Sequence, residues 1–128
     1  MGFRKKSRPR VGLALGGGAA RGLAHLGVIR VLKEEKIPID FVAGVSVGSI
    51  VAAGLAAGLP MEQLLRQAER VNWKHLGRWS LSLQQGFNRN DRMTTWLESV
   101  LPVRTFEELE IPLRIVATDL QADAGGPG

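Results

Sequence analysis

Three short apolar runs limit the folds that this 128-residue chain can adopt. They occupy residues 11–15, 41–45 and 113–118, and each has the length and character of a buried strand. Between them, apolar residues recur at helical spacing. The helices that this spacing predicts occupy residues 20–36, 47–57, 61–71 and 91–101. Strands that alternate with helices favour an α/β fold, in which a parallel sheet is covered by helices on both faces.

The composition excludes several classes of protein. The chain has no Cys, which excludes disulfides, thiolate nucleophiles and Cys-ligated zinc. Its longest apolar run, residues 50–60, is too short and too rich in Gly and Ala to span a bilayer. The apolar stretch after the basic first residues is also too short for a signal peptide. We therefore expect a cytoplasmic protein, at most peripheral to the membrane.

The net charge of +5 comes entirely from the first ten residues. Their cations are Arg4, Lys5, Lys6, Arg8 and Arg10. The rest of the chain carries equal numbers of acidic and basic side chains, whereas a nucleic-acid-binding domain would carry its excess on a folded face. We therefore expect no nucleic-acid partner and a basic, disordered tail over residues 1–10. Weak association of residues 4–10 with an anionic membrane surface is the second interpretation of this tail.

The strongest candidate site is the run Gly44, Val45, Ser46, Val47 and Gly48, which stands between an expected strand and an expected helix. In this setting a serine occupies a strained turn that exposes its hydroxyl, and small residues two positions to either side let the chain bend. The N-terminus of the following helix favours negative charge developing on a substrate. Ser46 is therefore the candidate catalytic nucleophile. The alternative is a plain turn in which Ser46 only caps the helix.

A second candidate site is the glycine loop that follows the first strand. Gly16, Gly17 and Gly18 leave their amide groups unblocked, as acyl transfer requires of groups that bind an oxyanion. Arg21, at the start of the next helix, would brace the loop or add positive charge. A dinucleotide-binding turn is the alternative, but the spacing of Gly16, Gly18 and Gly22 misses its pattern by one residue. No acid ends the next strand to bind a ribose.

A histidine base for Ser46 is not expected. The α/β hydrolases place the histidine after both the serine and the acid, usually far downstream, and this chain has only His25 and His75, with no histidine after residue 75. His25 stands on the first helix beside the glycine loop, and we expect it to support that loop. His75 is expected at the surface. If Ser46 is a nucleophile, a Ser–Asp pair is the better prediction.

The two motifs together resemble a known family. Residues 13–29, L-A-L-G-G-G-A-A-R-G-L-A-H-L-G-V-I, and residues 39–53, I-D-F-V-A-G-V-S-V-G-S-I-V-A-A, closely resemble bacterial patatin-like phospholipases. The resemblance runs over residues 11–120. It implies an α/β fold and a lipid acyl hydrolase with a Ser–Asp dyad that needs no metal or organic cofactor. It assigns Ser46 as the nucleophile. The oxyanion hole that it implies consists of the amides of Gly17, Gly18 and Ala19, supported by Gly16, Arg21 and Gly22.

One part of the family's pattern is missing. The catalytic Asp of the family belongs to a D-G-G or D-G-A motif further downstream, and this chain contains no such motif. Asp123 is followed by Ala-Gly-Gly and is not assigned, and Asp119 is expected to be structural. We therefore expect residues 11–120 to be the N-terminal part of a patatin-like domain truncated at its C-terminus. Residues 121–128 are expected to be irregular and non-native.

Two functions follow as hypotheses. The first is a serine acyl hydrolase that acts on lipid or other esters in lipid catabolism or remodelling. The alternative is a catalytically inactive fragment or binding module that lacks the dyad Asp. Because a serine hydroxyl depends on a base to take its proton, the 128 residues alone are expected to hydrolyse esters poorly.

Overall fold

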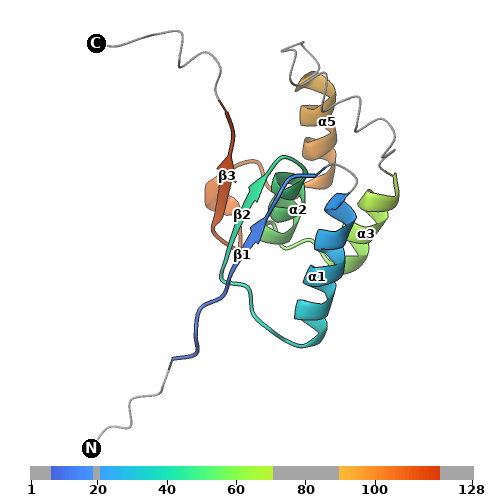
Figure 1. The fold of residues 1–128 in the computed structure, drawn as a ribbon. Coiled ribbons are helices and arrows are strands. Elements are labelled where there is room, and N and C mark those ends of the chain that lie inside the picture. Colours follow the sequence, from blue (N-terminus) through green and yellow to red (C-terminus); the bar gives the residue numbers. More distant parts are fainter. Residues whose placement is uncertain (1–6, 19–20, 71–89, 119–128) are drawn as a thin grey trace, which may run out of the picture.

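The computed structural model describes residues 7–18, 21–70 and 90–118, with only the backbone of residues 90–92. Its elements, in chain order, are β1 (Gly12–Leu15), α1 (Gly22–Glu34), β2 (Phe41–Val45), α2 (Val47–Ala56), α3 (Met61–Arg70), α5 (Asn90–Val100), the 3-10 helix η2 (Phe106–Glu108) and β3 (Leu113–Val116) (Figure 1). The strands and helices that the sequence predicts are all present, with bounds that differ by at most two residues. No helix within the described ranges is long and apolar enough to cross a membrane.

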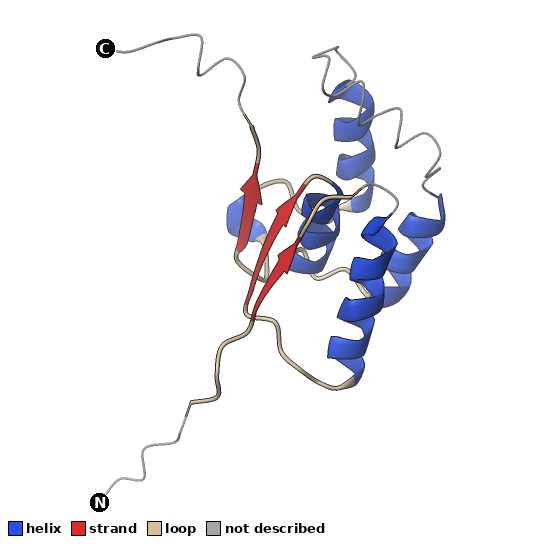
Figure 2. Cartoon of the chain, viewed as in Figure 1, coloured by secondary structure: helices blue, strands red, loops and turns tan. Residues whose placement is uncertain are grey.

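The three strands form a parallel sheet in the order β1-β2-β3, with their arrows pointing the same way in Figure 2. In the register, Gly44 of β2 lies opposite Leu15 of β1 on one side and Ile115 of β3 on the other. The carboxyl ends of all three strands therefore meet at one edge of the sheet. The glycine loop follows β1 at this edge, and Ser46 follows β2.

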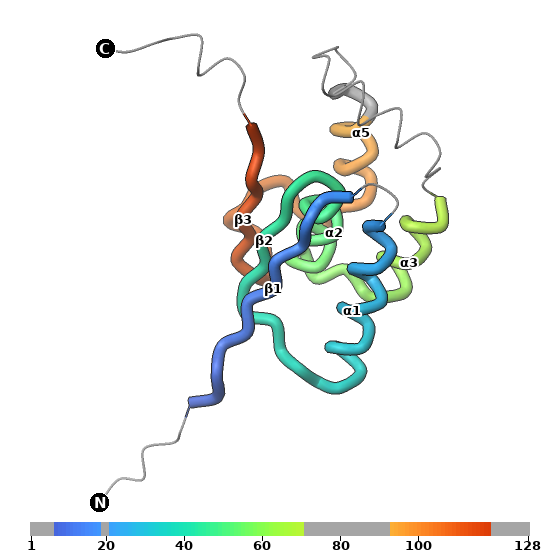
Figure 3. Tube along the Cα trace, viewed as in Figure 1, coloured from blue at the N-terminus to red at the C-terminus, as the bar shows by residue number. Residues whose placement is uncertain are grey.

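The hydrophobic core lies between one face of the sheet and the helices. Leu15, Val42 and Leu113, one from each strand, point into it and are almost fully buried. Helix α2 packs against all three strands, and seven of its ten residues are buried, as its apolar sequence predicts. Helices α1 and α3 pack in turn against α2, beyond it from the sheet (Figure 3).

The α/β fold with a parallel sheet and packed helices is confirmed, but the opposite face of the sheet is not covered by any described element, whereas the sequence predicts helices on both faces. Phe41, Val45 and Val116 project from it with 37%, 41% and 65% of their surface exposed. The physical reason is the strand order. Because crossovers between parallel strands are right-handed, a sheet whose order runs β1-β2-β3 receives both connections on the same face. Accordingly, α1, α2, α3 and α5 all lie on one side (Figure 2).

Two cations of the basic N-terminal segment contact the region where β2 begins. Arg8 donates two hydrogen bonds, of 2.8 and 2.7 Å, to the two carboxylate oxygens of Asp40, which also accepts one from the Val11 amide at 2.7 Å. Arg10 lies over the ring of Phe41, 4.3 Å from its centroid. Residues 8–10 are thus tied to the start of β2, which corrects the expectation that the tail extends to residue 10. Residues 1–6 lie outside the described part of the chain.

Local signals in the sequence explain where several elements begin and end. Helix α2 ends before Gly58, which adopts a φ of +79° that few other residues tolerate. A capping box begins η2, where Thr105 is the N-cap and Glu108 accepts hydrogen bonds from the amides of Arg104 and Thr105. These two amides hold the pKa of the Glu108 carboxyl below its ordinary value, because they stabilise the charged form.

Candidate active site

Ser46 occupies the turn that joins β2 to α2. Its backbone has φ 55° and ψ −129°, a conformation that is unfavourable for a residue with a side chain. Ser46 is the N-cap residue of α2, but its hydroxyl makes no capping hydrogen bond, and the residue is exposed. This geometry contradicts the plain helix cap and agrees with the strained, exposed serine that the Gly-Val-Ser-Val-Gly pattern predicts.

The glycines on either side of Ser46 permit close backbone contacts. A Cβ atom on Gly44 would lie 2.6 Å from the carbonyl oxygen of Gly48. A Cβ atom on Gly48 would lie 2.6 Å from the carbonyl oxygen of Gly16 and would overlap the carbonyl of Leu15. Gly48 therefore lets the first turn of α2 rest directly on the end of β1. This contact brings the serine turn against the glycine loop.

The glycine loop lies beside the serine. A Cβ atom on Gly17 would stand 3.2 Å from Cβ of Ser46 and 3.8 Å from its Oγ. Gly18 has a φ of +136°, which turns the chain toward α1. Within the described residues, neither the amide of Gly17 nor that of Gly18 donates a hydrogen bond. Ala19, the third predicted oxyanion donor, lies outside the described residues.

Contacts with α1 hold this loop on both sides of its turn. His25 donates a hydrogen bond from Nε2 to the carbonyl oxygen of Gly16 at 2.7 Å, as expected of a residue that supports the loop. The amide of Arg21 donates to the carbonyl of Gly18 at 3.0 Å, and the Arg21 side chain runs past Gly18. Arg21 itself is exposed and forms no ion pair with the described residues.

The start of α1 also packs directly on the serine turn. A Cβ atom on Gly22 would lie 2.5 Å from Cγ2 of Val47, which is almost fully buried. The absence of a side chain at Gly22 thus lets the first turns of α1 and α2 touch. The described residues of the predicted loop and turn therefore form one contiguous group at the carboxyl edge of the sheet.

Comparison with known proteins identifies this arrangement. Residues 13–126 match the patatin-like phospholipase family. This chain belongs to that family. The match includes the glycine loop, the serine turn and all of the described strands except the first residue of β1.

Individual relatives support the same assignment. The patatin-like chain is 37% identical over 122 residues to an uncharacterized NTE family protein of Mycobacterium tuberculosis, a match that covers 93% of this chain and 33% of that protein. It is 48% identical over 69 residues to the Lysophospholipase NTE1 of Mycosarcoma maydis, covering 54% of this chain and 4% of that protein. It is also 48% identical over 63 residues to a patatin-like phospholipase domain-containing protein of Caenorhabditis elegans, covering 49% of this chain and 4% of that protein. The chain therefore spans about a third of the mycobacterial relative and a far smaller part of the other two.

No described Asp or His side chain of this patatin-like chain forms a hydrogen bond with Oγ of Ser46. Asp40, the one aspartate whose side chain the structure describes, precedes β2, whereas Ser46 follows it. The length of the strand separates them by roughly 16 Å. His25 is the described histidine, and its Nε2 already donates to Gly16. His75, Asp119 and Asp123 lie outside the described residues. Nor do three His, Asp or Glu side chains gather as a metal site in the part of the chain described.

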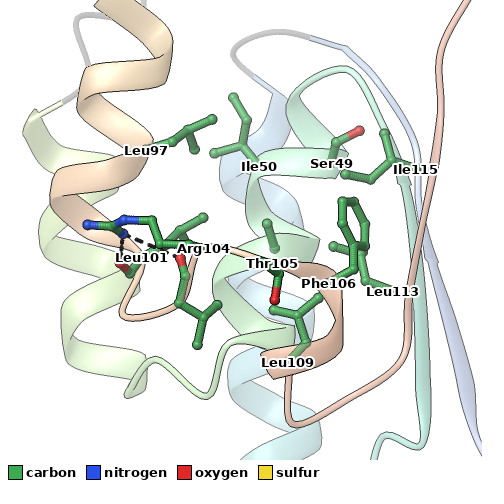
Figure 4. A pocket seen from close by; sticks show the side chains of 12 residues that line it. Ser49, Ile50, Leu97, Leu101, Arg104, Thr105, Phe106, Leu109, Leu113 and Ile115 are labelled. Carbon is green, nitrogen blue, oxygen red and sulfur yellow. Dashed lines mark hydrogen bonds between the residues drawn. The ribbon is translucent and has the colours of Figure 1, made fainter.

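An apolar cavity lies next to the serine turn of this patatin-like chain. It has a volume of about 240 Å³ and opens between α2, α5 and the segment that leads through η2 into β3 (Figure 4). Its lining residues are Ser49, Ile50, Ala53, Leu97, Leu101, Val103, Arg104, Thr105, Phe106, Leu109, Leu113 and Ile115. Sequence analysis does not predict this cavity. The spacing of residues 49, 50 and 53 places them on one face of α2, and this much can be predicted from the sequence. The opposing walls come from residues 97–115, which are distant in the sequence.

Proposed function

We propose that this patatin-like chain carries the nucleophile and the oxyanion hole of a serine acyl hydrolase that acts on lipid esters. The observation that carries the proposal is the strained turn at Ser46, an exposed residue whose hydroxyl makes no capping hydrogen bond and lies beside Gly17. The family match and the name of the Mycosarcoma maydis relative, a lysophospholipase, agree with a lipid ester as substrate.

In the proposed reaction, Oγ of Ser46 attacks the carbonyl carbon of the ester. The negative charge that develops on the carbonyl oxygen accepts hydrogen bonds from the amides of Gly17, Gly18 and Ala19. The N-terminus of α2 adds a favourable electrostatic field. The alcohol then leaves with the proton that the base took from Ser46, and water hydrolyses the acyl-serine to release the acid.

The base that takes the proton of Ser46 is proposed to come from outside the described residues. Two observations support this view. The Asp40 carboxylate lies before β2 and accepts a hydrogen bond from Arg8, and Nε2 of His25 donates to the carbonyl of Gly16. The same observations favour the alternative function, a lipid-binding module without turnover. The two functions differ in whether Ser46 reacts with an electrophile.

Labelling with a fluorophosphonate tests the proposal directly, because the serine oxygen displaces fluoride and remains bound to phosphorus. The full chain should be labelled, and Ser46→Ala should reduce the rate at least a hundredfold. Ser99→Ala is the matched control, since Ser99 is exposed on α5 and its hydroxyl only donates to the carbonyl of Trp96. Labelling of Ser46→Ala at the rate of the parent chain would exclude Ser46 as the nucleophile. An unlabelled parent chain that still binds lipid would favour the binding module.

A further inference from the structure

The end of the molecule that carries Ser46 differs in charge from the opposite end. Strands β1, β2 and β3 finish at this site end, and helices α1 and α2 begin there (Figure 1). The described residues that end these strands and begin these helices are 15–18, 21–24, 44–49 and 115–118. Arg21 is the one charged side chain among them. At the opposite end, where α1 finishes and β2 and β3 begin, basic residues such as Lys33 are accompanied by six acids: Glu34, Glu35, Asp40, Glu107, Glu108 and Glu110.

Exposed apolar side chains also stand around Ser46. Leu23, in the first turn of α1, is 45% exposed. Val45 directly precedes Ser46 and is 41% exposed, and Val116, its neighbour in the register on β3, is 65% exposed. Single apolar side chains are common on protein surfaces, whereas a group of them around one site favours contact with an apolar partner. We call Arg21, Leu23, Val45 and Val116 together the docking surface.

Contacts at the sheet edge hold the docking surface around the serine. The first turn of α1 packs on the serine turn at Gly22, and the Arg21 side chain runs past Gly18 of the glycine loop. Arg21 forms no ion pair with the described residues, so its charge is available to an external anion. The glycine loop follows β1, whereas Val116 ends β3 on the far side of β2. The docking surface therefore extends along the sheet edge on both sides of Ser46.

We propose that the docking surface binds an anionic lipid surface and presents Ser46 to the ester carbonyls within it. The inference rests on the proposed function, because a lipid ester as substrate makes a lipid surface the partner. The three apolar side chains enter the headgroup region, where their burial favours binding. Arg21 pairs with the anionic headgroups, and the six acids at the opposite end oppose any orientation that turns them toward the membrane.

This orientation differs from attachment through the basic N-terminal segment. Strand β1 begins at the end opposite Ser46, and Arg8 is tied there to Asp40. A membrane bound through residues 8–10 would therefore face the amino end of the sheet. The two modes of attachment predict that different residues enter the lipid.

A fluorophore at each end of the molecule distinguishes the two orientations. The chain has no Cys, so Leu23→Cys and Ile37→Cys each provide a single position for an environment-sensitive label such as NBD. Ile37 is the matched control, because it is 41% exposed and follows α1 at the opposite end. With phosphatidylglycerol vesicles, the emission of the label at residue 23 should shift to shorter wavelength, and that at residue 37 should not. A shift at residue 37 alone, equal shifts at both positions, or no shift at either would overturn the proposal.

Sedimentation of the full chain with the same vesicles measures the affinity. Leu23→Ser should lower it about tenfold, because a partly buried leucine contributes binding of that order. Arg21→Gln should lower it about fivefold, and this loss alone should vanish at high salt or with phosphatidylcholine vesicles. Ile37→Ser and Lys33→Gln are the matched controls and should bind as the parent does, while circular dichroism checks that each variant is folded. Equal losses for Leu23→Ser and Ile37→Ser would contradict the docking surface.

Two further comparisons separate this inference from the alternatives. If the double variant Lys5→Gln/Lys6→Gln lost vesicle binding while Leu23→Ser kept it, the membrane contact would lie in the N-terminal segment and the proposal would be wrong. A soluble fluorophosphonate tests the nucleophile without vesicles. Labelled Ser46 without vesicle binding would contradict the docking surface alone, whereas insertion at residue 23 with Ser46 unlabelled would support the docking surface and contradict the nucleophile.

Discussion

At the scale of single residues, the site depends on positions where a side chain cannot fit. Gly44 and Gly48 approach backbone atoms so closely that a methyl group would overlap them, and Gly22 packs against Val47. Ser46 carries a side chain in a backbone conformation that is itself unfavourable. The close packing around the turn therefore maintains the strain at the serine.

Gly48→Ala should destabilise the chain by about 3 kcal/mol, because the new methyl group would collide with the carbonyls at the end of β1. Gly27→Ala is the matched control. Gly27 is exposed in the middle of α1 with nothing within 4 Å of an added Cβ atom. This change should stabilise the chain by about 0.5–1 kcal/mol, since alanine favours the helix. Urea unfolding measures both, and equal effects of the two substitutions would contradict the proposed close contact.

His25 should act as a positioning residue for the glycine loop. His25→Ala removes the hydrogen bond to the carbonyl of Gly16 and should slow labelling of Ser46 about tenfold, because the loop amides lose their orientation. His25→Gln should restore most of the rate, since its amide N–H can donate to the same carbonyl. The unfolding midpoint serves as the second readout. Equal rates for His25→Ala and the parent chain would show that the bond does not matter for the site.

At the scale of elements, β2 is held at both of its ends. Its carboxyl end leads into the serine turn, while its amino end is tied to the N-terminal segment through Asp40 and Arg8. The hydrogen bonds from Arg8, followed by the one from Val11, hold the pKa of the Asp40 carboxyl far below its ordinary value. The ion pair therefore connects the segment before β1 to the central strand.

This low pKa predicts a dependence of stability on pH. A carboxyl whose pKa is lowered by folding contributes stability that is fully present above its unfolded pKa of about 3.9 and is lost as the pH falls toward the folded value. Asp40→Asn removes this contribution but can still accept the Val11 amide bond. The variant should be less stable than the parent at pH 7, and the difference should shrink below about pH 4.

Urea midpoints at pH 7 and pH 3 measure this difference. Glu35→Gln is the control for the removal of one negative charge, because Glu35 is exposed at the C-terminal end of α1 and forms no ion pair with the described residues. A gap between parent and Asp40→Asn that is as large at pH 3 as at pH 7 would contradict the ion pair.

At the scale of the whole molecule, the described sheet is one-sided. The helices and the core lie on one face, while Phe41, Val45 and Val116 are exposed on the other. Strand β3 is also an edge strand, since only β2 pairs with it among the described strands. Exposed apolar edge strands are templates for association with other chains.

The 128-residue chain should therefore associate with itself through this face. Val116→Lys should weaken the association about tenfold, because a charge on an edge strand opposes pairing. Val28→Lys is the matched control on the exposed side of α1, where Val28 is 53% exposed. Sedimentation velocity over a range of concentrations measures the effect. A monomeric parent chain, or equal effects of the two lysines, would show that the open face does not drive association.

Local sequence determined the elements and the character of the site. The apolar runs and helical spacing predict each strand and helix, because these patterns depend on neighbouring residues alone. The Gly-Val-Ser-Val-Gly turn and the glycine loop predict the strained serine, since small residues are needed wherever backbones touch. The family follows from the same two motifs, and the match over residues 13–126 confirms it. The roles of Ser46 and of the loop amides remain proposals.

Tertiary structure decided what lies beside these motifs. The strand order determines which face of the sheet receives the helices, and the residue pattern of a strand does not show which strands pair with it. The bond from Arg8 to Asp40 joins groups 32 residues apart, so the charge of the tail alone could not predict it. The walls of the cavity beside α2 come from two stretches, residues 49–53 and 97–115, which are distant in the sequence and meet when β3 pairs with β2. Hydrophobic periodicity and motif spacing reflect residues that are close together in the sequence, whereas these contacts depend on how complete helices and strands pack against one another.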